Sequence, residues 1–133
     1  MKPEGLHLDF KHGLTSQKKI AKTLLAFANT EGGEIIVGVS DERKFIGIDP
    51  QEEMFMVFEA IRNYCQPTIN VKFEVFEFNP LEEEIGQNEK YLLIVNVPKS
   101  ETSPHLFVFK DDPPIYYKRL ADRSLPSILP NND

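Results

Sequence analysis

Asp9 and Lys11 stand two residues apart in the segment LHLDFK, where alternation along a strand would put both side chains on one face. Metal-dependent nucleases use such a pair: the carboxylate binds Mg²⁺ or Mn²⁺, and the lysine stabilises the attacking water or the charge on the phosphate. Glu4 lies just upstream and Asp41 ends a later apolar strand, so three carboxylates could meet. The same triplet is more often an exposed strand edge with a cross-strand ion pair, and the spacing alone leaves both interpretations open.

Two groups of basic residues could contact a phosphate backbone. Three lysines share one side of a helical pattern that begins near Ser16. The segment Tyr116–Arg119 combines cations with aromatic rings that could stack on bases. A terminal strand with packed tyrosines and exposed cations is the simpler interpretation of that second segment. The candidate nucleic-acid contacts are Lys11, Lys18, Lys19, Lys22, Lys118 and Arg119.

The overall charge argues against a general nucleic-acid binder. The chain has 133 residues and a formal net charge of −6. Residues 1–33 hold five Lys and three acids, giving +2, whereas residues 34–133 hold ten Lys or Arg and 18 acids, giving −8. A local basic surface or bound metal ions could override this mean. A protein-interaction module without nucleic-acid binding is the alternative that the charge favours.

The histidines and the cysteine do not indicate a metal site. His7, His12 and His105 lack the spacing of zinc ligands, and a single cysteine cannot form an intramolecular disulfide. Cys65 ends an apolar helical pattern, which predicts a buried thiol. The apolar runs are too short to span a bilayer, and residues 1–13 lack the apolar region of a secretion signal. We therefore expect a cytoplasmic protein without a membrane span.

The apolar pattern predicts two helices and several strands in one α+β domain. The first helix begins at Thr15 or Ser16 and stops at Gly32–Gly33, and the second lies between Pro50 and Pro67. Two main helices packed on a largely antiparallel β-sheet follow from this order. We expect the domain to cover residues 1–122, with residues 123–133 as a frayed C-terminal tail. Strands are predicted near residues 6–10 and at 34–41, 44–49, 69–78, 91–98, 105–110 and 115–120.

The glycine pair Gly32–Gly33 follows a helix and precedes a strand. Phosphate-binding loops run in the opposite order, because the anion binds the free N–H groups at a helix N-terminus. A helix C-terminus presents carbonyl oxygens, which repel anions. We therefore predict that Gly32 or Gly33 is a left-handed helix cap, and that the pair does not bind a nucleotide.

Taken in order, these segments resemble the Schlafen AlbA-type domain, a module assigned to nucleic-acid binding. The most specific part is AFANTEGGEIIVGV at residues 26–39, and the resemblance covers nearly the whole chain. The matching segments are Glu4, LDFK at 8–11, AFANTEGG at 26–33, IIVGVSDE at 35–42, IGI at 46–48, VNVPKS at 95–100, SPH at 103–105 and YYKR at 116–119.

The resemblance also implies a metal site and an assembly. Schlafen relatives that cleave RNA hold a metal with three acidic residues, which match Glu4, Asp9 and Asp41 here, and Lys11 would assist them. Asp9 stands where the family usually has Glu, so its oxygens would lie about 1.5 Å further back. The 133 residues contain no second lobe like the one that clamps RNA in animal relatives. We therefore expect a homodimer that builds an equivalent groove.

The leading hypothesis is a nucleic-acid-binding regulatory domain for DNA or RNA that acts as a homo-oligomer, and the sequence leaves open whether the protein is an enzyme. The first alternative is a metal-dependent endoribonuclease that holds Mg²⁺ or Mn²⁺ with Glu4, Asp9 and Asp41. The second alternative is the protein-interaction module.

Overall fold

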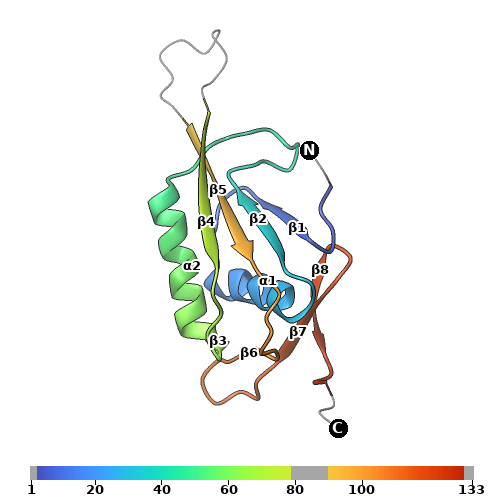
Figure 1. The fold of residues 1–133 in the computed structure, drawn as a ribbon. Coiled ribbons are helices and arrows are strands. Elements are labelled where there is room, and N and C mark those ends of the chain that lie inside the picture. Colours follow the sequence, from blue (N-terminus) through green and yellow to red (C-terminus); the bar gives the residue numbers. More distant parts are fainter. Residues whose placement is uncertain (1–2, 79–89, 131–133) are drawn as a thin grey trace.

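The computed structural model describes residues 3–78 and 90–130. A four-stranded sheet lies at the centre of this fold (Figure 1). The helix α1 (Gln17–Asn29) connects the parallel strands β1 and β2, and the other neighbouring strands are antiparallel. This confirms the predicted α+β domain with a largely antiparallel sheet. The order across the sheet is β1 (Leu8–Lys11), β2 (Gly33–Val37), β5 (Lys90–Val97) and β4 (Lys72–Phe78).

The helix α1 has a capping residue at each end. Ser16 Oγ accepts a hydrogen bond from the backbone N–H of Lys19 at 3.3 Å, which satisfies a donor that the helix leaves free. Leu24 and Phe27 are fully buried on its inner side. Past the helix, Gly32 has a φ of +76° and its N–H donates to the carbonyl of Phe27 at 2.7 Å. The predicted left-handed cap is therefore Gly32.

The helix α2 (Pro50–Tyr64) begins at a cap formed by Asp49. The Asp49 carboxylate accepts from the backbone N–H groups of Gln51 at 3.0 Å and Glu52 at 3.3 Å. Pro50 fits the first turn because its missing N–H would have no partner there. Within the described residues no helix is long and apolar enough to cross a membrane. The buried side of α2 carries Val57, Ala60 and Ile61.

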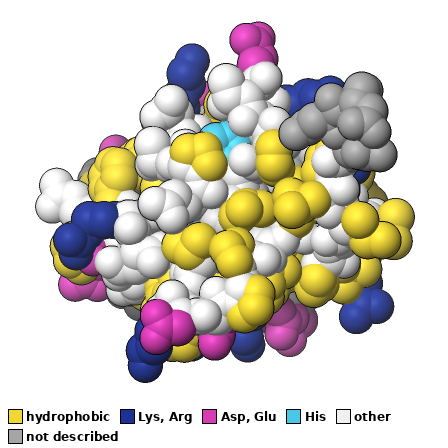
Figure 2. Space-filling model, turned by 90° about the horizontal axis from the view of Figure 1, so that it is seen from below, with side chains coloured by type: hydrophobic (Ala, Val, Ile, Leu, Met, Phe, Trp, Pro, Cys, Tyr) yellow, Lys and Arg dark blue, Asp and Glu magenta, His cyan; other side chains and the backbone are white. Residues whose placement is uncertain are grey.

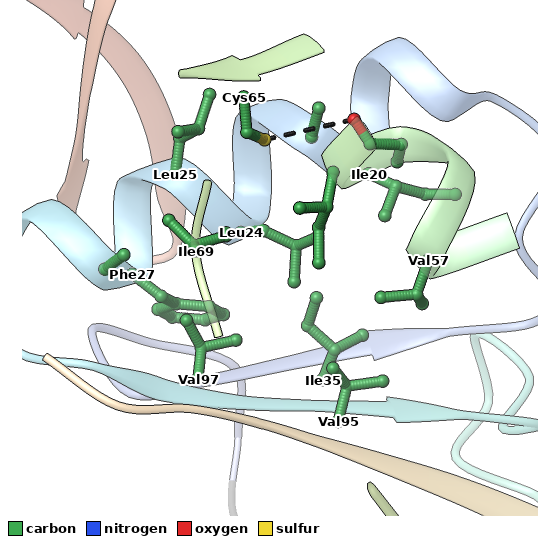
Figure 3. Packing of buried hydrophobic residues seen from close by; sticks show 14 of the residues in the cluster. Ile20, Leu24, Leu25, Phe27, Ile35, Val57, Cys65, Ile69, Val95 and Val97 are labelled. Carbon is green, nitrogen blue, oxygen red and sulfur yellow. Dashed lines mark hydrogen bonds between the residues drawn. The ribbon is translucent and has the colours of Figure 1, made fainter. Parts of the chain in front are cut away.

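The main hydrophobic core lies between the sheet and the two helices (Figure 3). Leu24 and Phe27 of α1 point toward Ile35 of β2 and toward Val95 and Val97 of β5. None of these five side chains is more than 2% exposed. Burying each large apolar side chain contributes about 1.5–3 kcal/mol, so this layer fixes α1 on the sheet.

Cys65 lies at the end of α2 as the buried thiol that the sequence predicts. Its exposed fraction is 6%, and burial raises the pKa of the thiol to about 12. The sulfur donates a long hydrogen bond of 3.9 Å to the carbonyl of Ala60 (Figure 3). Such a thiol is not a nucleophile at neutral pH, because the thiolate is the reactive form.

Two short antiparallel ribbons complete the domain. β3 (Cys65–Gln66) pairs with β6 (Leu106–Phe107), and β7 (Tyr116–Leu120) pairs with β8 (Arg123–Ser127). Residues 123–127 were expected in a frayed tail and instead form β8. Ala121 takes a left-handed φ of +53° in the turn between the two strands. The turn lacks the Gly or Asn by which a sequence usually indicates a hairpin.

Among the described residues, one predicted strand does not form and another is reduced to two residues. Residues 44–49 make one isolated bridge, between Val39 and Phe45, because Gly38 with a φ of +110° ends the regular part of β2. Residues 105–110 contribute only the two residues of β6, and Lys110 turns the chain with a φ of +52°. Residues with a positive φ therefore limit both segments: Gly47, with a φ of +84°, lies within the first, and Lys110 ends the second.

Gly32→Ala is expected to lower the free energy of unfolding by about 2–4 kcal/mol. A Cβ at this position would lie 2.8 Å from the carbonyl oxygen of Val97 and from the backbone nitrogen of Lys99, at a φ that alanine disfavours. The matched control is Gly13→Ala, where the nearest atom would be Glu53 Oε1 at 3.7 Å. Urea unfolding measures both variants, and equal losses of stability would contradict the cap.

Candidate functional site

A pair of carboxyl groups lies where the N-terminal turn meets β1. The backbone N–H of Gly5 donates to the carbonyl of Leu8 at 2.9 Å, so the chain folds back along β1. Glu4 Oε2 then accepts from the N–H of Phe10 at 3.0 Å, and the Glu4 carboxylate is hydrogen-bonded to Asp9. The structure thus brings together Glu4 and Asp9, two of the three acidic residues that the sequence singled out.

Three cations surround this carboxyl pair. Lys11 Nζ lies 3.3 Å from Asp9 Oδ2, and Arg119 Nη2 lies 3.9 Å from Asp9 Oδ1. Arg43 Nη2 lies 3.4 Å from Glu4 Oε1. Each carboxyl group therefore faces at least one cation that the chain itself supplies. The sequence pattern indicated Lys11, but no spacing connected Arg43 with Glu4.

The carboxyl pair holds a proton up to mildly acidic pH. Burial, and then the hydrogen bond to Glu4, raises the pKa of Asp9 to about 6 against the attraction of Lys11 and Arg119. The hydrogen bond with Asp9 is also the largest cause of change at Glu4, and it lowers the pKa of Glu4. Below about pH 6 the pair therefore shares one proton, with Asp9 as the donor.

Arg119 is a buried structural residue, and this corrects its assignment as a nucleic-acid contact. Its exposed fraction is 4%. The guanidinium donates to the carbonyls of Gly5 at 3.0 Å and Leu8 at 3.3 Å and to Ser124 Oγ at 3.0 Å. It also lies over the ring of Phe27 at 4.6 Å. Arg119 therefore connects the β7–β8 ribbon with β1 and α1.

Asp41 does not join the carboxyl pair. It is exposed, and its backbone carbonyl, not its carboxylate, accepts from Arg43 Nη1 at 3.4 Å. No three His, Cys, Asp or Glu side chains among residues 3–78 and 90–130 are grouped so that they could hold a metal ion. The expected Mg²⁺ or Mn²⁺ site of Glu4, Asp9 and Asp41 therefore does not fit this geometry. Lys11, Arg43 and Arg119 supply the compensating positive charge instead.

A basic cluster forms where α1 meets the segment after β6. Lys18 Nζ lies 3.6 Å and Lys110 Nζ lies 5.0 Å from the centre of the Phe109 ring. Lys22 Nζ lies 5.3 Å from the ring centre of Phe107. We call Lys18, Lys22 and Lys110 the basic cluster. The sequence predicted two of its members but missed Lys110, which is far away along the chain.

The other predicted nucleic-acid contacts lie apart from the basic cluster. Lys118 is exposed on the face of β7 opposite to Tyr117 and Arg119, because neighbouring side chains of a strand alternate. Lys11 is held in the ion pair with Asp9. Lys19 is exposed on α1. The structure therefore does not assemble the six predicted basic residues into one surface.

The side chain of Asn29 forms hydrogen bonds with residues that are far away along the chain. Its Nδ2 donates to the carbonyls of His105 at 2.8 Å and Tyr117 at 3.0 Å. Its Oδ1 accepts from the N–H of His105 at 2.9 Å and from Ser103 Oγ at 3.0 Å. Asn29 therefore connects α1 to two distant segments of the chain.

His105 lies beside a surface hollow of about 280 Å³. Its Nδ1 is 2.9 Å from the carbonyl of Pro67, which can only accept, so Nδ1 carries the proton. In the neutral ring Nε2 then accepts from the hydroxyl of Ser100 at 2.6 Å. Ser100 Oγ in turn accepts from the N–H of Thr102 at 3.1 Å. These bonds give the polar groups partners and explain why a histidine is tolerated at 4% exposure.

The variant Asp9→Asn tests the shared proton. Since the folded pKa of Asp9 lies above its ordinary value of 3.8, its protonation stabilises the folded state fully below pH 3.8, and this contribution is lost as the pH rises through about 6. An amide does not titrate, so the free energy of unfolding of the variant relative to the parent should rise between about pH 4.5 and 6.5. The pKa of Glu4 is lowered from its ordinary value of 4.5, so the titration of Glu4 changes the free energy of unfolding only below about pH 4.5. A constant difference between the two proteins across this window would show that Asp9 is not perturbed.

Comparison with known proteins agrees with the resemblance seen in the sequence. A crystal structure of the DIP2311 protein from Corynebacterium diphtheriae shares the fold, with a TM-score of 0.53 and 18% identity over 92% of this chain. This chain corresponds to 22% of that protein's length. The family model of Schlafen, AlbA_2 matches residues 4–127, which include both the carboxyl pair and β8. The chain therefore belongs to the Schlafen AlbA_2 family.

Proposed function

We propose that the chain is a nucleic-acid-binding domain whose contact surface is the basic cluster of Lys18, Lys22 and Lys110. The observation that carries this proposal is the position of two ammonium groups over one half-buried ring, with Lys18 at 3.6 Å and Lys110 at 5.0 Å from the centre of Phe109. Proteins that bind single strands combine cations for the phosphates with aromatic rings for the bases. Membership of the Schlafen AlbA_2 family supports a nucleic-acid-related role.

The lysines of the basic cluster are available to an anion. The ion pairs found within the described part of the chain involve none of the three. Interaction with the aromatic rings holds the ammonium groups in place, which reduces the entropy that binding must remove. Asp111 and Asp112 follow Lys110 and are exposed, so they weaken the local positive field. We therefore expect affinities in the range of non-specific binding, about 10⁻⁴–10⁻⁶ M.

The charge distribution favours a local binding surface over a long basic groove. On the face shown in Figure 2, hydrophobic side chains occupy the middle, and both Lys or Arg and Asp or Glu stand around the margin. Neither sign forms a continuous stripe on that face. A few lysines beside aromatic rings suit short single strands, and phosphate contacts of this kind do not distinguish DNA from RNA.

The double variant Lys18→Glu/Lys22→Glu tests the basic cluster. We expect its dissociation constant for a labelled single-stranded oligonucleotide at low salt to rise at least about tenfold, because two cations that face the phosphates become anions. The slope of log K against log salt should become shallower by about 0.7 for each phosphate that the variant no longer neutralises. Fluorescence anisotropy measures both quantities, with DNA and RNA strands of equal length.

The control is Lys44→Glu/Lys99→Glu, which changes the net charge by the same amount at exposed positions outside the cluster. At about 0.15 M salt, where the Debye length is about 8 Å, it should bind within about threefold of the parent, since the field of two distant charges is screened. Equally weakened binding in both variants would mean that only net charge matters and would refute the cluster. No binding by the parent at tens of micromolar would favour the protein-interaction module.

Metal-dependent cleavage of RNA is the weaker proposal. The approach of Glu4 and Asp9 beside Lys11 supports it, whereas the cations around the pair and the exposed position of Asp41 oppose it. We expect no cleavage of structured RNA with Mg²⁺ or Mn²⁺ in millimolar excess. Cleavage by the parent that disappears in both Asp9→Ala and Asp41→Ala would overturn this expectation and establish the nuclease.

A further inference from the structure

The strand β4 forms an edge of the four-stranded sheet. Among the described strands it pairs only with β5, so the backbone groups on its other side have no sheet partner. Val75 is 47% exposed and Phe76 is 52% exposed. A long edge strand with exposed apolar side chains is a template for pairing with another strand.

The helix α2 extends this apolar edge. Phe55 is 60% exposed and Phe58 is 55% exposed on its outer side. The rings of Phe58 and Phe73 are 5.2 Å apart and nearly perpendicular, so Phe73 and its alternate neighbour Val75 point to the helix side of the sheet. We call Phe55, Phe58, Phe73 and Val75 the edge patch. Single exposed apolar residues are common, but an exposed ring of a helix in contact with an edge strand, as Phe58 is with Phe73, marks an interaction surface.

The charges of β4 favour one antiparallel register over its neighbours. On the side opposite to the edge patch, Lys72 and Glu74 are neighbours, and neither forms an ion pair within the described residues. When a second β4 approaches antiparallel, a two-fold axis at Lys72 or Glu74 places like charges opposite each other. An axis at Val75 puts Glu74 opposite the partner's Phe76. An axis at Phe73 puts Lys72 opposite the partner's Glu74, twice by symmetry.

We propose that two copies of this chain dimerise through β4, antiparallel, about a two-fold axis at Phe73. The two four-stranded sheets then join along Lys72, Phe73 and Glu74 of each copy, the part of β4 that both strands share in this register. Phe73 faces the partner's Phe73, and Val71, the residue just before β4, faces the partner's Val75. The two α2 helices lie on the same side of this sheet, so Phe55 and Phe58 of each copy face the other. Opposite charges in direct register and the aromatic pair both stabilise cross-strand pairing.

Charge reversal tests the register without nucleic acid, so the result is independent of the proposed binding function. The parent should show twice its mass of 15.3 kDa in light scattering at micromolar concentrations. Glu74→Lys and Lys72→Glu should each dissociate at least about tenfold more readily, because like charges then face each other. The double variant Lys72→Glu/Glu74→Lys restores both pairs and should recover the dimer. A monomeric parent, or a double variant no better than the single ones, would refute the proposal.

Disulfide trapping locates the axis directly. The only native thiol, Cys65, is buried, so the background is low. Phe73→Cys places two thiols directly opposite across the axis, within the Cα separation that a disulfide accepts. In the same register two Val75→Cys positions are four residues out of alignment, about 13 Å apart, and should not cross-link. The double variant Val71→Cys/Val75→Cys keeps Phe73 and should cross-link if Phe73→Cys fails to fold. Trapping by Val75→Cys alone would contradict the axis at Phe73.

Discussion

The side-chain amide of Asn29 is the group on which the arrangement of distant segments depends. Its two donors and its oxygen are fully used, by His105, Tyr117 and Ser103. An apolar replacement would leave two backbone carbonyls and an N–H without partners inside the protein, at a cost of about 1–3 kcal/mol for each group. The same bonds hold β6 and β7 against α1, which lets Lys22 lie over the rings of Phe107 and Tyr117.

The carboxyl pair has a comparable role at the other side of α1. A buried guanidinium needs an anion and hydrogen-bond acceptors, and Arg119 finds them in Asp9 and in the carbonyls of β1 and its turn. Removing one member of such a buried pair typically costs about 3–5 kcal/mol. The acidic residues that family resemblance associates with a metal therefore also attach the β7–β8 ribbon to the sheet. Their charge is compensated by side chains, which explains why Asp9 can be both buried and close to Glu4.

Local patterns predicted the two helices, a left-handed cap at Gly32 or Gly33, the buried Cys65 and the α+β class, because each depends on neighbouring residues or on periodic burial. The strand β8 was not predicted, because the two-residue turn of Ala121 and Asp122 takes its left-handed φ at an alanine instead of at Gly or Asn. Spacing also could not reveal that Arg43 reaches Glu4 or that Lys110 shares a ring with Lys18, since the partners meet only after folding. Arg119 was misjudged because its strand pattern gives no sign that its face is covered by α1.

The net charge of the chain does not predict the charge of the basic cluster, because some cations form ion pairs and others do not. Five of them form ion pairs within the described residues, whereas the basic cluster forms none and Lys72 faces an open strand edge. The basic cluster lies on α1 and next to β6, and the edge patch lies on β4 and α2, so a dimer through β4 would leave the basic clusters of both copies exposed. Two weak clusters joined in one particle act on a single strand at high effective concentration. An acidic chain could thereby hold nucleic acid more tightly than one cluster of three lysines allows.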